Sequence, residues 1–166
     1  MTCDTCPQYF SLTASDILFY GNCVKLSHPL RKQSDVEAIK EAIADGTVDA
    51  VSTDHTPLSA IDKSYPFDKA PVGMLGLQTA FSTSLSNLVK PGVITLSRLA
   101  ELLSYNPAKI IGREVGIKVG MKADFAVCDI DCEYILSESD LGEKDGVKNT
   151  PWLGQMMYGK VIGMIQ

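Results

Sequence analysis

The clearest pattern of hydrophobic and polar positions lies in residues 34–45, where apolar side chains recur at helical spacing. One stripe is formed by Val36, Ile39, Ala42 and Ile43. This periodicity predicts an amphipathic helix. Ser34 and Glu37 match the two ends of a capping box, and Gly46 is placed to end the helix. The β-type run at residues 48–53 predicts a strand, and a helix followed by a strand is typical of α/β folds.

The segments on either side are less regular. Residues 1–10 are predicted to form a short buried strand that Pro7 stops, and a helical turn is expected near residues 13–18. After the strand at 48–53, residues 55–74 show little periodicity. Loops of that length in a compact domain are usually functional or disordered.

Three further helices are predicted downstream. The first covers about residues 76–89, with an apolar side that begins at Leu77, and the second covers about 96–104. Asn106 is expected to cap a short third helix that ends at Gly112. From about residue 113 the pattern changes to short β-type segments, at 123–130, 132–137 and 158–165. The sequence therefore predicts a boundary near 112–120, with residues 1–112 in one unit and 113–166 in a β-rich subdomain.

The amino-acid composition argues against several classes of function. The chain has 166 residues, of which 45% are hydrophobic, and a net charge of −5. An acidic chain argues against a nucleic-acid partner, which needs a basic face. No apolar run approaches the roughly 20 residues of a membrane helix, and no signal segment is recognisable, so no membrane association is expected. An odd count of five cysteines favours a reducing, cytoplasmic location over a disulfide framework.

The cysteines are interpreted as packing residues. Cys3 and Cys6 have the CxxC spacing, but no second Cys or His pair follows at zinc-site spacing. In a strand, residues three apart point to opposite faces. Cys128 and Cys132 lie in the β-rich tail, where packing is again the simplest role.

Asp54 is the main candidate for chemistry. It ends the predicted strand 48–53, and catalytic residues of α/β barrels and open sheets lie where strands end. A carboxylate there can bind a metal ion and accept a proton from water. Asp is also favoured as the cap of a turn. The periodicity alone leaves both interpretations open.

Several segments carry a family resemblance. They are VSTDHTP, FDKAPVGMLGLQTAF, TCDTCPQYFSLT, VKLSHPLR, LLSYNPAKIIG, GMKADFAVCDID and KNTPWLGQMMYGKVIG. Together they resemble dihydroorotases, members of the cyclic-amidohydrolase branch of the amidohydrolase superfamily, along almost the whole chain. The last segment resembles dihydroorotases more than their relatives, whereas NPAKIIG and GMKADFAV are shared across the superfamily.

The resemblance implies a fold and a reaction. The fold would be α/β, with residues 1–112 as the C-terminal part of a TIM-like (β/α)8 barrel and 113–166 as a small β-sheet tail. Dihydroorotases interconvert dihydroorotate and N-carbamoyl-aspartate in pyrimidine biosynthesis, at a zinc site on the C-terminal face of the barrel. By the resemblance, Asp54 would be both a zinc ligand and the general base.

The resemblance also implies substrate contacts. Backbone groups of the loop that contains Ala70, Pro71 and Gly73 would bind the dihydropyrimidine ring, because small residues let the backbone approach a ligand closely. Ser27 occupies a position that the family usually fills with a substrate-binding Asn. Gly76 fits a turn into the next helix equally well.

This sequence departs from the family pattern at several positions. Dihydroorotases usually carry a His four residues after the metal Asp, and Leu58 at that position cannot bind the substrate carboxylate. His28 replaces a family Pro and is interpreted either as a substitute positive group or as a surface His. Arg31 is interpreted either as an anion clamp or as one partner of a structural ion pair.

The largest departure concerns the metal site. The His-x-His motif, the middle-strand carboxylate or modified Lys, and two further metal His residues of the family have no match, since His28 and His55 are the only histidines. A catalytic zinc usually needs about three protein ligands, so Asp54 cannot hold it alone. We therefore expect a fragment that is inactive alone and that associates with itself or with the missing N-terminal part.

Three functions remain in consideration for the parent protein. The first is a dihydroorotase-like zinc amidohydrolase that acts on a small-molecule substrate. The second is a hydantoinase- or allantoinase-like cyclic amidase, which Leu58, Ser27 and the TCPQY segment favour. The third is a non-catalytic dihydroorotase homologue that serves as an assembly partner.

Overall fold

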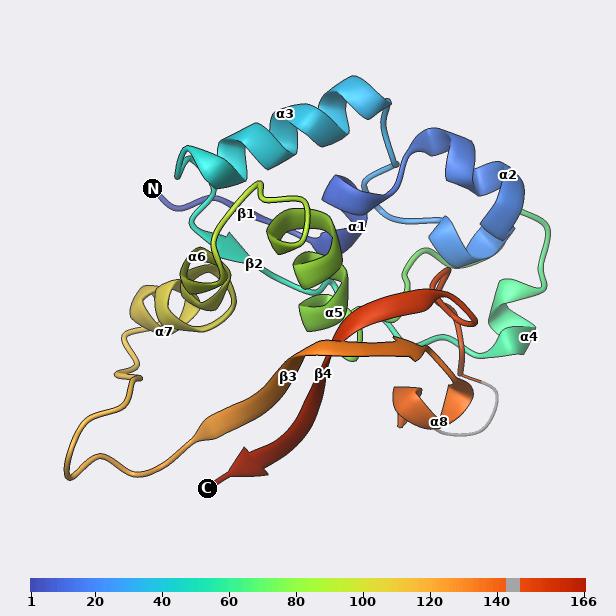
Figure 1. Ribbon diagram of the computed structural model, residues 1–166. Coiled ribbons are helices and arrows are strands. Elements are labelled where there is room, and N and C mark those ends of the chain that lie inside the picture. Colours follow the sequence, from blue (N-terminus) through green and yellow to red (C-terminus); the bar gives the residue numbers. More distant parts are fainter. Residues whose placement is uncertain (143–146) are drawn as a thin grey trace.

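The computed structural model (Figure 1) describes residues 1–142 and 147–166 and contains a pair of very short parallel strands. Strand β1 (Asp4–Thr5) pairs with β2 (Ala50–Val51), and helix α3 (Gln33–Ala44) connects them in the sequence. This is a βαβ arrangement, as expected for an α/β fold. Within the described residues the parallel sheet has two strands, so the outer edge of each strand is unpaired.

The first ten residues differ from the sequence prediction. The strand is two residues long, and helix α1 (Pro7–Ser11) replaces its predicted second half. Pro7 therefore starts a helix, because the first helical turn does not need the N–H that proline lacks. The predicted helical turn is confirmed as a 3-10 turn (Ala14–Asp16) followed by α2 (Ile17–Tyr20) and a second 3-10 turn (Gly21–Val24).

Helix α3 confirms the predicted amphipathic helix and corrects its cap. Val36 and Ile43 are buried, and Gly46 follows the last turn with a φ of 91°. The predicted cap Ser34 lies inside the helix. The orphan N–H of Lys32 instead donates to the Asp35 carboxylate at 3.1 Å. The N-cap is therefore Lys32, two residues before the predicted cap, and the side chain three residues after it satisfies its N–H.

After β2, the chain forms helix α4 (Ala60–Lys63) within the long loop and then α5 (Ala80–Ser84), which continues as a π-helical segment (Leu85–Val89). Helix α5 starts four residues after the predicted position. Leu77 therefore precedes the helix and is 63% exposed, so its predicted place in the apolar stripe is wrong. Leu85 and Leu88 of that stripe are buried as predicted.

The next helical region is continuous. Helix α6 (Leu96–Ala100), a π-helical segment (Glu101–Tyr105) and α7 (Asn106–Ile110) follow one another with helical backbone angles at the joints. Asn106 is therefore not a cap. Its side-chain amide instead donates to the backbone oxygen of Asp49 at 2.7 Å, which ties this helix to the segment that leads into β2.

The tail is an antiparallel hairpin of β3 (Phe125–Ile135) and β4 (Met156–Ile165), with α8 (Glu138–Leu141) in the connection (Figure 1). The two segments predicted before residue 138 form a single strand, β3, whose register shifts between Asp129 and Glu133. Strand β4 packs beside α5, where Ser82 Oγ donates to the oxygen of Gly159 at 2.6 Å.

Two hydrophobic clusters hold these elements together. The first joins residues from both halves of the chain, among them Leu12, Val24, Leu75, Leu136 and Trp152. The second lies around α3, β2 and the helices that follow, and contains Phe10, Ile43, Val51, Leu88 and Leu102. Among the described helices, none combines the length and apolar character that a membrane crossing requires.

An ion pair between α8 and β4 provides a prediction for stability. Asp140 accepts from Lys160 at 2.7 Å and from Ser137, and these bonds hold the pKa of the Asp140 carboxyl down at about 2. Because the pKa in the folded state is lowered, the stabilisation is complete above about pH 4 and is lost as the pH falls through 2. Asp140→Asn is expected to reduce the free energy of unfolding at pH 7 by about 1 kcal/mol, since Lys160 is partly solvated.

Urea denaturation at several pH values measures this effect. Asp131→Asn is the matched control, because its 3.4 Å pair with Lys90 involves a carboxylate that is 85% exposed. No measurable change is expected for the control. An Asp140→Asn deficit that persisted unchanged below pH 2 would rule out the ion pair as its cause.

Candidate functional site

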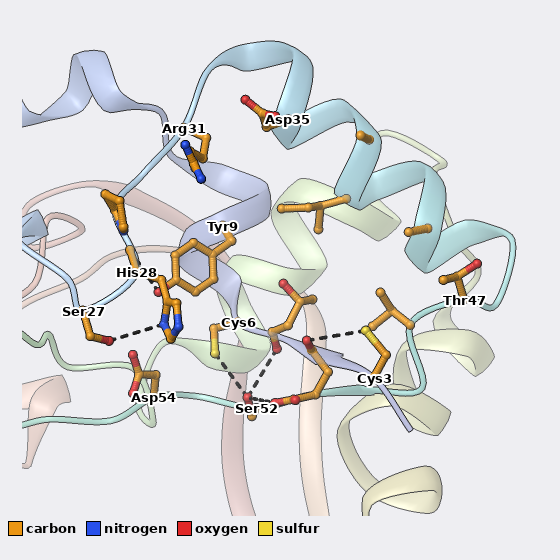
Figure 2. A pocket seen from close by; sticks show the side chains of 17 residues that line it. Cys3, Cys6, Tyr9, Ser27, His28, Arg31, Asp35, Thr47, Ser52 and Asp54 are labelled. Carbon is orange, nitrogen blue, oxygen red and sulfur yellow. Dashed lines mark hydrogen bonds between the residues drawn. The ribbon is translucent and has the colours of Figure 1, made fainter. Parts of the chain in front are cut away.

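A cavity of about 980 Å³ opens beside β1 and β2. Helix α3 lines one side with Ala38, Ile39 and Ala42 beside the carboxylate of Asp35, and polar groups from other segments line the rest (Figure 2). Among these polar groups are Tyr9, Ser27, His28, Arg31, Ser52 and Asp54. The fold thus brings two of the predicted site residues, Ser27 and Asp54, to one cavity.

Asp54 has an unusual backbone conformation. Its φ is 46°, and it is the only non-glycine residue with positive φ in the part of the chain that the structure describes. Such backbone conformations cluster at functional sites, where the surroundings hold them in place. The next residues fix the turn, because His55 pairs with Met74 in a β-bridge and the N–H of Thr56 donates to the oxygen of Met74 at 2.9 Å.

The Asp54 carboxylate faces the cavity below His28 and Ser27 (Figure 2). No hydrogen bond or ion pair to this carboxylate forms within residues 1–142 and 147–166. The side chain therefore does not cap the following turn, which was the structural alternative. An exposed carboxylate with free lone pairs can accept a proton or bind a cation.

Tyr9 contributes a neutral phenol to the same cavity. Its hydroxyl donates to the backbone oxygen of His28 at 3.2 Å, and the two rings meet edge to face with centroids 6.5 Å apart. Burial, followed by the negative charge of Asp54, raises the pKa of Tyr9 to about 12. Tyr9 therefore remains protonated at neutral pH. Tyr9 lies in the TCPQY segment, but nothing in that pattern of residues indicates that its ring would lie near Asp54.

Cys6 also lines the cavity and is buried. Its Sγ is 3.2 Å from Ser52 Oγ, which itself donates to the Asp4 carboxylate at 2.5 Å. Burial raises the pKa of the Cys6 thiol, and the charges of Asp54 and Asp4 raise it further. A thiol held protonated is a poor nucleophile, so Cys6 has the character of a packing residue. All five cysteines are free, and Cys128 and Cys132 are half-buried.

The predicted ring-binding loop does not line this cavity. The carbonyl oxygens of Ala70 and Pro71 accept from the ammonium groups of Lys25 (2.6 Å) and Lys63 (3.0 Å). The Gly73 N–H donates to the Lys25 oxygen at 2.9 Å. Of residues 70–73, Val72 alone has a backbone N–H and C=O without a hydrogen-bond partner in the described chain, and it is 44% exposed.

His28 and Arg31 lie on the cavity wall, whereas Leu58 does not. The Nδ1 of His28 is 3.5 Å from Ser27 Oγ. Arg31 forms no ion pair with any residue that the structure describes. The N–H of Leu58 donates to the Asn149 side chain at 3.0 Å. Asn149 was not singled out by the sequence, because its partner lies 91 residues away.

Two glycines let the Asp54 turn and the loop before α5 pack closely. A Cβ on Gly73 would approach Thr56 Cβ to 2.6 Å, and one on Gly76 would overlap the backbone oxygen of Thr53. Gly76→Ala is therefore expected to lower the free energy of unfolding by about 2 kcal/mol or more, because backbone cannot move aside as a side chain can. Urea denaturation measures it.

Gly163→Ala is the control for that substitution. A Cβ there meets nothing within 4 Å, and the backbone has no positive φ. We expect it to change stability by a few tenths of a kcal/mol, or about 0.5 kcal/mol at most. Equal losses in the two variants would contradict the close packing at Gly76.

The described residues fit a metal ion only in part. They contain no cluster of three His, Cys, Asp or Glu side chains that could bind one. His55, beside Asp54, uses Nδ1 to accept the N–H groups of Gly76 and Leu77 at 3.3 and 3.2 Å. A catalytic zinc needs about three protein ligands. Within residues 1–142 and 147–166, no such set of ligands surrounds the exposed Asp54 carboxylate.

Comparisons with known proteins show which family the chain resembles. Residues 14–164 match the amidohydrolase family. The dihydroorotase of Chlorobaculum tepidum is 40% identical in an alignment 168 positions long that covers 99% of this chain, and that of Acetivibrio thermocellus is 38% identical over 162 positions. Among solved structures, the L-hydantoinase (dihydropyrimidinase) of Arthrobacter aurescens superposes with a TM-score of 0.89 at 26% identity, over 99% of this chain and 37% of its own.

The chain belongs to the amidohydrolase family, with an α/β fold of the TIM-barrel type. It resembles dihydroorotases in sequence and hydantoinases in structure. It spans about 38% of the length of the curated relatives that it matches.

Proposed function

We propose that this chain forms the last two strands of a (β/α)8 barrel and its β-sheet tail, within a dihydroorotase-like zinc amidohydrolase. The complete enzyme would interconvert dihydroorotate and N-carbamoyl-aspartate in pyrimidine biosynthesis, in the cytoplasm. The observation that carries the proposal is the Asp54 carboxylate, which is unpaired in the described chain, follows a parallel strand in a rare backbone conformation and faces a cavity. The names of the relatives at about 40% identity support the substrate class.

The chain's own residues would have distinct roles. Asp54 would accept the proton of the attacking water, and would be one ligand of a zinc ion whose remaining ligands lie outside this chain. Ser27 would contact the substrate beside it. In the loop of Ala70, Pro71 and Gly73, the free N–H and C=O of Val72 are the groups that could pair with a ring amide, since a ring amide offers one donor and one acceptor.

A cyclic amidase of the hydantoinase type is the second candidate. Leu58 cannot bind a substrate carboxylate, and hydantoin or dihydropyrimidine rings without that carboxylate would not require a cation there. The structural similarity to the Arthrobacter and Brevibacillus agri enzymes, both at 26% identity, favours it. A non-catalytic assembly partner is the remaining alternative.

Turnover of three substrates by the full-length protein separates these candidates. Dihydroorotate, hydantoin and dihydrouracil would be supplied with zinc, and ring opening followed by ultraviolet absorbance. Selective turnover of dihydroorotate supports the leading proposal, and selective turnover of the uncharged rings supports the second. Absence of turnover with all three, in a folded zinc-loaded protein, supports the assembly role.

A further inference from the structure

We infer that Asn149 is a positioning residue that holds the Asp54 turn against the loop of residues 70–73. It comes from the segment before β4, far from both loops in sequence. The inference rests on the proposed function, because it assigns Asn149 a role in placing the proposed base beside the proposed ring-binding backbone.

The side chain of Asn149 is fully engaged with backbone groups. Its Oδ1 accepts from the N–H of Leu58 at 3.0 Å, and its Nδ2 donates to the oxygens of Thr56 (2.9 Å) and Gly73 (3.2 Å). Its own backbone oxygen accepts from the N–H of Leu75 at 3.0 Å. The residue is 3% exposed, so water cannot replace these bonds without opening the core.

Only an amide fits this set of partners. Two carbonyl oxygens and one N–H require a group that donates twice and accepts at least once, which the Asn side chain does. An aspartate could accept from Leu58 but would place a charge against two carbonyl oxygens. Because all the partners are backbone atoms, the bonds specify the path of the two loops whatever side chains the loops carry.

Two of the bonds hold the turn that follows the residue proposed as the base. Thr56 and Leu58 lie two and four positions after Asp54, whose φ of 46° persists only if the surrounding structure holds it. Asn149 holds the chain just beyond that point and, through Gly73, the neighbouring loop. Without it, the turn can relax to an extended conformation, and the Asp54 carboxylate would leave the cavity.

Amide hydrogen exchange on the chain tests the positioning itself. In Asn149→Ala, exchange at the Leu58 amide is expected to accelerate about tenfold beyond any change in the α3 amides. Asn149→Asp keeps the acceptor for Leu58, so that amide should remain protected. In Asn149→Asp, exchange at the Thr56 amide, which donates to Met74, should accelerate because the Nδ2 bonds to the oxygens of Thr56 and Gly73 are lost.

Asn106→Ala is the matched control. It removes another side-chain amide that donates to backbone, at Asp49, without touching either loop. Faster Leu58 exchange in Asn106→Ala than in Asn149→Ala, at equal global stability, overturns the inference. If Asn149→Ala does not fold, the exchange rates of the Leu58 and Thr56 amides in Asn149→Asp test the inference instead. Equal protection of these two amides overturns the inference.

Kinetics of the full-length enzyme add a readout that general destabilisation would not produce. Asn149→Ala is expected to lower kcat about tenfold or more at a temperature where the variant is fully folded, while Asn106→Ala stays near wild type. Unchanged kcat in folded Asn149→Ala also overturns the role. If the wild type hydrolyses no cyclic amide, the proposed function fails, but the exchange experiment still decides whether Asn149 positions the turn.

Discussion

Asp54→Asn is expected to reduce kcat of the full-length enzyme about 1,000-fold while leaving its folded structure intact. The reduction follows from removal of the carboxylate that would accept the proton, an effect typical of lost general bases. The fold should tolerate the change because no described residue hydrogen-bonds to this carboxylate. Asn is also among the few residues that adopt positive φ readily, so the backbone at 46° can persist.

The measurement is steady-state ring opening together with circular dichroism and thermal unfolding. Asp131→Asn serves as the control for loss of one negative charge, since Asp131 lies on the hairpin with its side chain 85% exposed. The control should retain wild-type kcat. A turnover in Asp54→Asn within a few-fold of wild type would remove Asp54 from the chemistry, even if the enzyme proved to be a cyclic amidase.

The chain on its own is expected to self-associate, so that light scattering gives a mass about twice its 18.0 kDa or more. Both outer edges of the β1–β2 pair are unpaired within the described residues, and the distal half of β4 exposes apolar side chains. Among these are Ile162 (65%), Met164 (58%) and Ile165 (53%). Open edges with exposed apolar residues pair readily with other strands.

Lysine substitutions on the β3–β4 hairpin test whether its exposed apolar side chains cause the self-association. Ile162→Lys combined with Met164→Lys is expected to shift the mass toward the monomer, because edge lysines block strand pairing. Ile61→Lys on α4, where the native side chain is 73% exposed and lies off the sheets, is the control and should not change the mass. A monodisperse 18.0 kDa species at high concentration would contradict the expectation outright.

Local periodicity predicted most of the elements but not their ends. Helix α3 is confirmed because its apolar positions repeat over enough residues to define a face. Of the strand predicted over residues 48–53, only Ala50 and Val51 form β2. The predicted start of α3 was wrong because Ser34 suits a cap position, whereas the helix begins after Lys32, whose N–H the Asp35 side chain accepts. Asn106 was assigned as a cap for the same reason, whereas its partner at Asp49 is a tertiary contact.

The residues of the candidate site were likewise predicted only in part. Asp54 and Ser27 were accessible from sequence because one ends a strand and both lie in family-like segments, and the fold places them at one cavity. Tyr9 and Asn149 could not be predicted from the sequence. The pKa of Tyr9 depends on the neighbouring charge of Asp54, and the side chain of Asn149 contacts residues 76 to 93 positions away. No local pattern encodes such distances. The roles of Ala70, Pro71 and Gly73 stay predictions.

The two lysines that hold the 67–71 segment have a consequence for affinity. Lys25 donates to the oxygens of Phe67 and Ala70, and Lys63 donates to those of Asn22 and Pro71. Loop immobilisation normally opposes binding, at about 0.5–1.5 kcal/mol for each side chain that a ligand must order. Here the ammonium groups have already ordered the loop, so a ring that meets Val72 would encounter a rigid surface and lose little conformational entropy on binding.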